Sequence, residues 1–184
     1  MKLYYTNPDG ANAVQSDPDK SLGGWLSITQ LPNDLMGNLF GTISEWGIDN
    51  DLRETKALML INDTGNPATS ITLHYENAST DEYSDIEMAV VSITTDGSGN
   101  ATMENIVSTR ALPVIGTFVS NKDIGNAISL PDMADGEVLG IWIKRTLNQT
   151  NIAAAKACDT LFTNYEAETP IETKEDISIV INYT

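Results

Sequence analysis

The side chains that most often perform catalytic chemistry are scarce in this sequence. The chain has one histidine, His74, and one cysteine, Cys158, so a cysteine nucleophile would depend on His74 as its base. His74 shares the polar face of an alternating run, residues 70–75, with Thr72, and we expect a strand whose histidine faces solvent. No G-x-S-x-G motif is present, and a zinc site usually takes several His or Cys ligands. These residues favour a buried thiol and a structural histidine, with a Cys158–His74 dyad as the open alternative.

Carboxylates are plentiful but form no distinctive catalytic pattern. Acidic clusters within 49–54, 81–87 and 166–176 each contain the two acids that a glycosidase requires, but such an enzyme also needs a fixed separation within a cleft. The turn 96–100 carries oxygen-bearing side chains at alternate positions but lacks the glycine and glutamate that complete a calcium-binding EF-hand loop. We interpret these acids as solvated surface charge, and we expect no metal ion and no cofactor.

The composition restricts the class of protein. The 184 residues include 26 Asp and Glu against 10 Lys and Arg, a formal net charge of −16, and 41% of the residues are apolar. This acidic balance argues against specific nucleic-acid binding, which needs clustered cations, and against docking on anionic lipid. A lone cysteine excludes an intrachain disulfide, and the N-terminal residues contain no apolar signal-peptide core. No window is long and apolar enough for a membrane span, so we expect a soluble chain made in a cytoplasm.

Turn residues divide the chain into short strand-like runs. Residues 1–20 contain a short possible strand, 2–6, followed by proline-rich and polar residues, and we interpret them as an N-terminal arm pinned by a neighbouring subunit. Residues 33–46 form the one clear amphipathic helical stretch, which either closes the core or contacts another subunit. The remaining runs are separated by turn signals, as in an antiparallel sandwich. They are 25–29, 55–61, 70–76, 86–94, 113–119, 127–130, 138–147 and 176–183.

These elements predict a mainly β fold. We expect an immunoglobulin-like antiparallel β-sandwich with one or two short helices over residues 21–184, preceded by the arm. No rhythm of alternating strands and helices is present, which argues against a doubly wound α/β fold. If 138–147 pairs with 176–183, residues 148–175 become a long loop or helical excursion at one end of the sandwich. Long connections of this kind are usually functional or contact a partner.

Five parts of the sequence together carry a family resemblance. They are Ser21-Leu22-Gly23-Gly24-Trp25, Asn38-Leu39-Phe40 with Ile43-Ser44-Glu45, the run from Thr55 to Asn62, the run from Gly140 to Arg145, and the run from Cys158 to Phe162. Over roughly residues 21–184 the chain resembles small virion structural proteins of tailed bacteriophages, especially crAss-like phages and their relatives. The resemblance implies a non-enzymatic particle component, such as a head–tail connector or tail ring, a collar element or a capsid decoration protein. It supplies no catalytic residues.

Assembly is therefore the expected function, with copies of the same chain and other virion proteins as partners and the virion as the location. The alternative is a carbohydrate-binding or adhesin-like module, in which Trp25, Trp46 or Trp142 would form an exposed platform. Lys144 and Arg145 either point outward at a strand edge or form a salt link to an acidic loop of another subunit. The side chains expected at partner interfaces are Tyr4, Tyr5, Leu35, Met36, Leu39, Phe40, Lys144, Arg145, Leu161 and Phe162.

Overall fold

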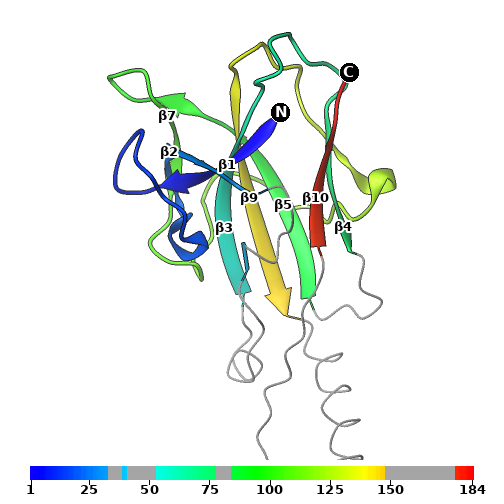
Figure 1. Ribbon diagram of the computed structural model, residues 1–184. Coiled ribbons are helices and arrows are strands. Elements are labelled where there is room, and N and C mark those ends of the chain that lie inside the picture. The colour runs from blue at the N-terminus through cyan, green and yellow to red at the C-terminus, as the bar shows by residue number, and fades with distance from the viewer. Residues whose placement is uncertain (33–38, 41–52, 78–83, 148–176) are drawn as a thin grey trace, which may run out of the picture.

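The computed structural model describes residues 1–32, 39–40, 53–77, 84–147 and 177–184, and antiparallel strands dominate these ranges (Figure 1). Seven strands form one sheet in the order β5-β9-β3-β1-β2-β7-β6, and three form a second sheet in the order β10-β4-β8. The mainly β, antiparallel class predicted from the sequence is confirmed, whereas this strand order does not by itself establish an immunoglobulin-like topology. The elements are β1 (Lys2–Asn7), η1 (Pro18–Lys20), β2 (Gly23–Gln30), β3 (Arg53–Ile61), β4 (Thr72–Asn77), β5 (Ser84–Ser92), β6 (Thr94–Thr95), β7 (Ala101–Asn105), η3 (Ile124–Asn126), β8 (Ile128–Ser129), β9 (Val138–Leu147) and β10 (Ile177–Asn182).

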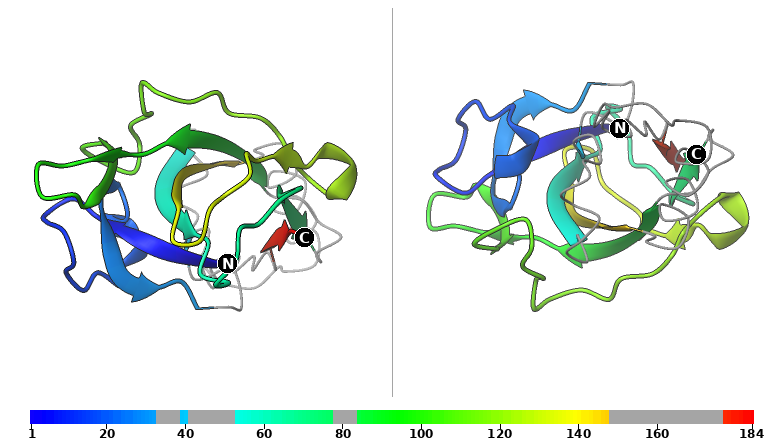
Figure 2. Two further views of the ribbon diagram at one scale, coloured as in Figure 1. Left: turned by 90° about the horizontal axis from the view of Figure 1, so that it is seen from above. Right: turned by 90° about the horizontal axis from the view of Figure 1, so that it is seen from below.

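The large sheet is strongly curled, and the three-stranded sheet lies across its open side (Figure 2). A segment that belongs to no strand joins the two sheets. Val119 exchanges two backbone hydrogen bonds of 2.9 Å with Met88 of β5, and Asn121 accepts one of 3.1 Å from the backbone N–H of Tyr75 in β4. The edge of β5 is therefore paired at Met88, and the same few residues connect the edges of the two sheets.

Apolar side chains are buried on both faces of the large sheet. A first cluster between the two sheets includes Leu58 and Ile141, and a second cluster on the opposite face includes Met59 and Trp142. Successive side chains of a strand point to opposite faces, so β3 and β9 contribute to both clusters in alternation. A strand covered on both faces has a nearly continuous apolar sequence, which is what residues 138–143 show.

Residues 1–20 are not a detached arm, and that expectation is wrong. Strand β1 lies between β3 and β2, with Tyr4 opposite Met59 and Thr6 opposite Leu26. The Tyr5 side chain belongs to the first cluster and is only 3% exposed. The division of the chain into an arm and a separate sandwich therefore fails, because β1 is an inner strand of the large sheet.

The irregular residues that follow β1 are fastened to the same sheet by polar contacts. The Ser21 hydroxyl accepts a hydrogen bond of 2.9 Å from the Thr6 backbone N–H and donates one of 2.5 Å to the Ala57 carbonyl oxygen. The Asp19 carboxylate forms an ion pair with Lys56, whose side chain is fully buried. The prolines and glycines of this stretch do mark a loop, as predicted. Its polar groups find their partners within the chain, which composition alone does not reveal.

Most of the other predicted strands are present, but one run forms no strand and one expected pairing is wrong. Six strand-like runs (25–29, 55–61, 70–76, 86–94, 138–147 and 176–183) coincide with β2, β3, β4, β5, β9 and β10, and 127–130 contains β8. The run 113–119 forms no strand. The runs 138–147 and 176–183 do not pair, since β9 lies between β3 and β5 and β10 pairs with β4.

The structure corrects the position expected for His74 and does not describe several other predicted features. His74 is buried, with Nε2 3.3 Å from Glu76 Oε1, so the expected solvent-facing histidine is wrong. Residues 121–123 form backbone hydrogen bonds with Tyr75, the next residue of β4, and composition gives no reason to expect this contact. The predicted helix 33–46 (apart from residues 39 and 40), the excursion 148–175 and Cys158 lie outside the described residues.

Truncating the aromatic ring of β1 tests whether this strand is part of the core. Tyr5→Ala should lower the free energy of unfolding by about 3 kcal/mol, because it removes a buried ring and leaves a cavity. Chemical denaturation measures the loss, and Tyr4→Ala, at a half-buried neighbouring position, is the matched control with a smaller effect. Wild-type stability in the Tyr5→Ala variant would indicate a detached arm instead.

Candidate interaction surface

Of the eight aromatic and aliphatic side chains predicted to contact partners, three lie inside the fold and four lie outside the described residues. Tyr5, Leu39 and Phe40 belong to the first buried cluster, and Tyr4 is half-buried in β1. For Tyr5, Leu39 and Phe40 the predicted interface role is wrong, because a partner cannot reach them while the core is intact. Leu35, Met36, Leu161 and Phe162 lie outside the described residues.

Lys144 and Arg145 form ion pairs with neighbouring strands of their own sheet. Lys144 pairs with Glu87 of β5, and its Nζ lies 5.0 Å from the centre of the Phe118 ring. Arg145 pairs with Glu54 of β3 at 2.5 Å, and its guanidinium lies 4.9 Å from the Phe40 ring centre. The two cations occupy opposite faces of β9, as the alternation predicts. The first alternative, an outward position at a strand edge, does not hold, because β9 lies between β3 and β5. In place of the second alternative, a salt link to another subunit, both cations form ion pairs within the chain.

The exposed apolar side chains gather in one segment, residues 107–124, which we call the strap. It lies outside β5 and crosses from the β7 side of the molecule to the β4 side (Figure 2). Val107 is 96% exposed and Val114 is 91% exposed. Of the nine large apolar side chains that are exposed in the described ranges, six belong to the strap. They are Val107, Leu112, Val114, Ile115, Val119 and Ile124.

The strap has a sequence that resists strand formation. Val114 and Ile115 are adjacent apolar residues, which do not fit the alternation of a half-buried strand. Pro113 lacks a backbone N–H, and Gly116 has φ = +114°, a conformation that favours glycine. A Cβ on Gly116 would also lie 3.0 Å from a methyl group of Val91. The strap therefore follows an irregular path pressed closely against β5.

Backbone hydrogen bonds fix the path of the strap at both ends. Just before it, the Ile106 N–H donates to the Leu22 carbonyl oxygen at 2.9 Å. The Thr109 carbonyl oxygen then accepts a bond of 2.6 Å from the Thr55 N–H at the start of β3. At the far end, Val119 is paired with β5 as described above. These contacts tie the strap to β3 and β5, and the residue before the strap to the residue that precedes β2.

A carboxylate holds the middle of the strap. Glu104 of β7 accepts hydrogen bonds from the backbone N–H groups of Val114 at 2.7 Å and Ile115 at 2.9 Å, one at each of its oxygens. Ala111 and Phe118 pack inward against the second cluster. The inner side of the strap thus covers this cluster, while its outer side holds aliphatic side chains in solvent.

The strap is also unusual in its charge. Residues 111–121 contain no charged side chain, although the chain as a whole carries a net charge of −16. Exposed Arg110 lies at one end of this uncharged stretch, and exposed Arg53 donates to its carbonyl oxygen at 3.4 Å. An apolar surface bordered by cations can contact an acidic protein without the like-charge repulsion found over most of this chain.

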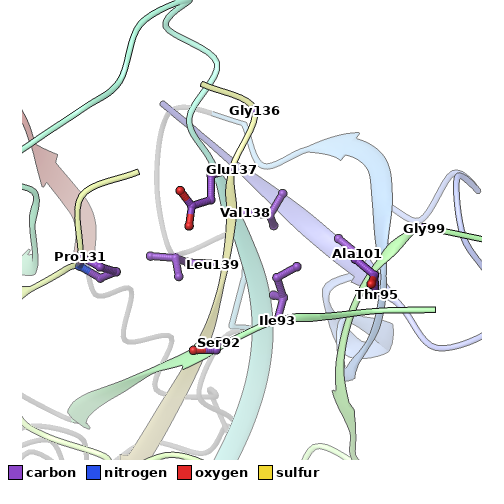
Figure 3. Close-up of a pocket in the computed structure, with 10 residues that line it drawn as sticks. All are labelled: Ser92, Ile93, Thr95, Gly99, Ala101, Pro131, Gly136, Glu137, Val138 and Leu139. Atoms are coloured by element: carbon purple, nitrogen blue, oxygen red, sulfur yellow. The ribbon is translucent and has the colours of Figure 1, made fainter. Parts of the chain in front are cut away.

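A shallow cleft of about 480 Å³ lies beside the upper ends of β5 and β9 (Figure 3). Leu139, Glu137 and Pro131 lie on one side of it and Ile93 and Ala101 on the other. The Glu137 carboxylate accepts a hydrogen bond of 2.8 Å from the Ala134 N–H, which fixes the turn before β9. The cleft therefore combines aliphatic walls with one carboxylate and the two hydroxyl groups of Ser92 and Thr95.

The turn that borders the cleft is organised by Asp96. Its carboxylate accepts hydrogen bonds from the side chain and backbone of Asn100, from Trp25 Nε1 at 3.0 Å and from the Ser98 N–H at 2.8 Å. These bonds, those from Asn100 above all, hold the pKa of Asp96 well below its ordinary value of 3.8. The oxygen-rich pattern at 96–100 thus serves to close a tight turn.

Across the described ranges, no group of three or more His, Cys, Asp or Glu side chains is placed to hold a metal ion. In the part of the chain that the structure describes, no helix has both the length and the apolar character needed to cross a membrane.

Sequence reasoning missed the strap because it interpreted 113–119 as one more strand. Two signals in the sequence point the other way: an adjacent apolar pair beside a proline, and a glycine two residues before Phe118. An apolar segment that cannot alternate is a poor strand, so either signal could have drawn attention to an exposed loop.

Removing the carboxylate under the strap should loosen it. Glu104→Ala deletes two charge-assisted hydrogen bonds and should lower the free energy of unfolding by about 1–2 kcal/mol. It should also speed hydrogen exchange at the amides of Val114 and Ile115, measured by NMR. Asp9→Ala, a carboxylate lost from an exposed site away from the strap, should change neither quantity. Unchanged exchange at both amides would show that Glu104 does not hold the strap.

The Asp96 turn predicts a dependence on pH. The native pKa lies below that of the unfolded chain, so the ionised carboxylate stabilises the fold above the unfolded value and this contribution is lost as the pH falls. The melting temperature of Asp96→Asn should therefore lie below that of the wild type near neutral pH. The difference should shrink as the pH falls below about 4. A difference that stays constant down to acid unfolding would contradict this explanation.

Comparisons with known proteins offer no family for this chain. Family models, curated proteins and solved structures were all compared with it, and none of them matches.

Proposed function

We propose that this protein is a non-enzymatic structural subunit that assembles with copies of itself through the strap. The observation that carries the proposal is the concentration of exposed aliphatic side chains on one well-anchored segment. Extended apolar patches on the surface of a soluble protein usually mark a contact with another protein. Because the strap is held at both ends and at its middle, its side chains are presented without a large ordering cost on binding.

The energetics favour association at this surface. Covering a Val, Leu or Ile side chain contributes roughly 1.5–3 kcal/mol, so burial of several strap residues can offset the loss of freedom on association. The chain has 26 acidic and 10 basic side chains, so two surfaces with this average composition would repel each other. The uncharged stretch 111–121 avoids this repulsion, which supports the strap as the contact surface.

The biological setting we propose is the virion of a tailed bacteriophage. The resemblance described above supports this setting, and the structure adds a scaffold with an outward apolar surface, as a particle subunit requires. A head–tail connector, tail ring or collar component is the form we favour, with other virion proteins as further partners, and a capsid decoration protein is the alternative. In a ring, one contact repeats between successive copies around an axis.

A carbohydrate-binding module has less support. Trp142 is fully buried in the second cluster, so it forms no part of an exposed aromatic platform. Trp25 is partly buried, and its Nε1 donates to Asp96. Trp46 lies outside the described residues. We therefore advance no second function.

Charged residues on the strap test the proposal. The double variant Val114→Asp plus Ile115→Asp should reduce the assembled protein to the 19.9 kDa monomer, measured by sedimentation velocity and mass photometry. Both side chains are exposed, so the free energy of unfolding should change by no more than about 0.5 kcal/mol per substitution.

The matched control is Val14→Asp, which places the same charge on a 72% exposed apolar residue outside the strap. This variant should assemble like the wild type. A wild-type protein that stays monomeric at its highest soluble concentration contradicts the proposal. So does a strap double variant that assembles normally.

A further inference from the structure

The cleft and the strap are complementary in chemistry. The cleft has aliphatic walls from Ile93, Val138 and Leu139, and its turn carries exposed acidic side chains at Asp132 and Glu137. The strap offers the reverse pattern, with projecting aliphatic side chains beside exposed Arg110. One surface is hollow and acidic, and the other is raised and bordered by a cation.

Charge makes this pairing the favoured one between two copies. Residues 131–137 contain three acids and no base, whereas the strap, residues 107–124, contains two bases, Arg110 and Lys122, and one acid, Asp123, near its far end. In a chain with a net charge of −16, few pairs of surfaces can meet without repulsion. A strap against a strap would cover apolar area but bring like cations together, while a cleft against a cleft would bring acids together.

We propose that the strap of one copy docks into the cleft of a second copy, with Val114 and its neighbours against the aliphatic walls and Arg110 near the acidic turn. This inference rests on the proposed function and names the two surfaces that meet. It is a contact between unlike surfaces, so each copy has a donor surface and an acceptor surface. The cleft is then occupied by protein and not by a small molecule.

Cross-linking between two different single-cysteine variants tests the contact directly. In a Cys158→Ser background, one variant carries Val114→Cys on the strap and the other carries Thr95→Cys in the cleft. After mixing and treatment with a short thiol cross-linker, the two variants should form a linked dimer. Val114→Cys mixed with Val14→Cys is the control and should give only background linkage. A mixture of the strap and cleft variants that links no better than this control overturns the inference.

Self-linkage gives a second decisive result. Val114→Cys alone should link poorly, because the proposed contact places the strap against the cleft. Efficient linkage of Val114→Cys to itself would show that straps meet each other, and this also overturns the inference. The Cys158→Ser background protein is first shown to assemble like the wild type.

A charge-reversal cycle provides an independent test by sedimentation equilibrium. Arg110→Glu and Glu137→Lys should each weaken association about tenfold, and the two together should restore most of the loss. Asp132→Lys replaces Glu137→Lys if loss of the hydrogen bond to Ala134 disturbs the turn. If the two losses of association affinity simply add in the double variant, Arg110 and Glu137 do not face each other and the proposed contact is wrong. If the wild type assembles through the strap but neither test succeeds, the proposed function stands and this inference fails, whereas a monomeric wild type defeats both.

Discussion

The structure depends on one constraint, which is that β3 and β9 bury apolar side chains on both faces of the same sheet. Trp142 and Ile141 are neighbours in the sequence, yet each is almost completely buried in a different cluster. A single sheet cannot shield both of its faces, so each face needs a cover. The three-stranded sheet covers one. On the other, the large sheet curls so that β2 and β7 contribute Leu26 and Met103, and the strap supplies the remainder.

The inward contacts of the strap are enough to explain its position in the fold. Ala111 and Phe118 face the second cluster, and Glu104 satisfies two backbone N–H groups between them. An irregular segment fixed in this way has to place its other side chains in solvent. Polar residues would be the ordinary choice there, whereas this chain places Val114 and Ile115 there. The fold does not require aliphatic side chains on this outer face. Their burial against another copy would explain why they are there.

Local patterns in the sequence predicted much of the fold, and contacts between distant residues account for the errors. The run 138–147 matches β9 residue for residue, because its alternation and its turn signals are local. The pairing of β10 with β4 depends on residues about a hundred positions apart, and no local signal carries it. The same limit explains β1, since the proline and glycine after it correctly mark a loop but do not show that Ser21 bridges Thr6 and Ala57. Most of the predicted interface residues are apolar, and a stable core buries such side chains first, as Leu39 and Phe40 show.

The central claim is that the outer face of the strap is covered when copies of this protein assemble. Hydroxyl-radical footprinting of Val114 and Ile115, read by mass spectrometry in the assembled protein and in the dilute monomer, measures this cover directly. The account predicts that both side chains are labelled readily in the monomer and are strongly protected in the assembly, with Val14 labelled equally in both states. Equal labelling of Val114 and Ile115 in the two states would contradict it.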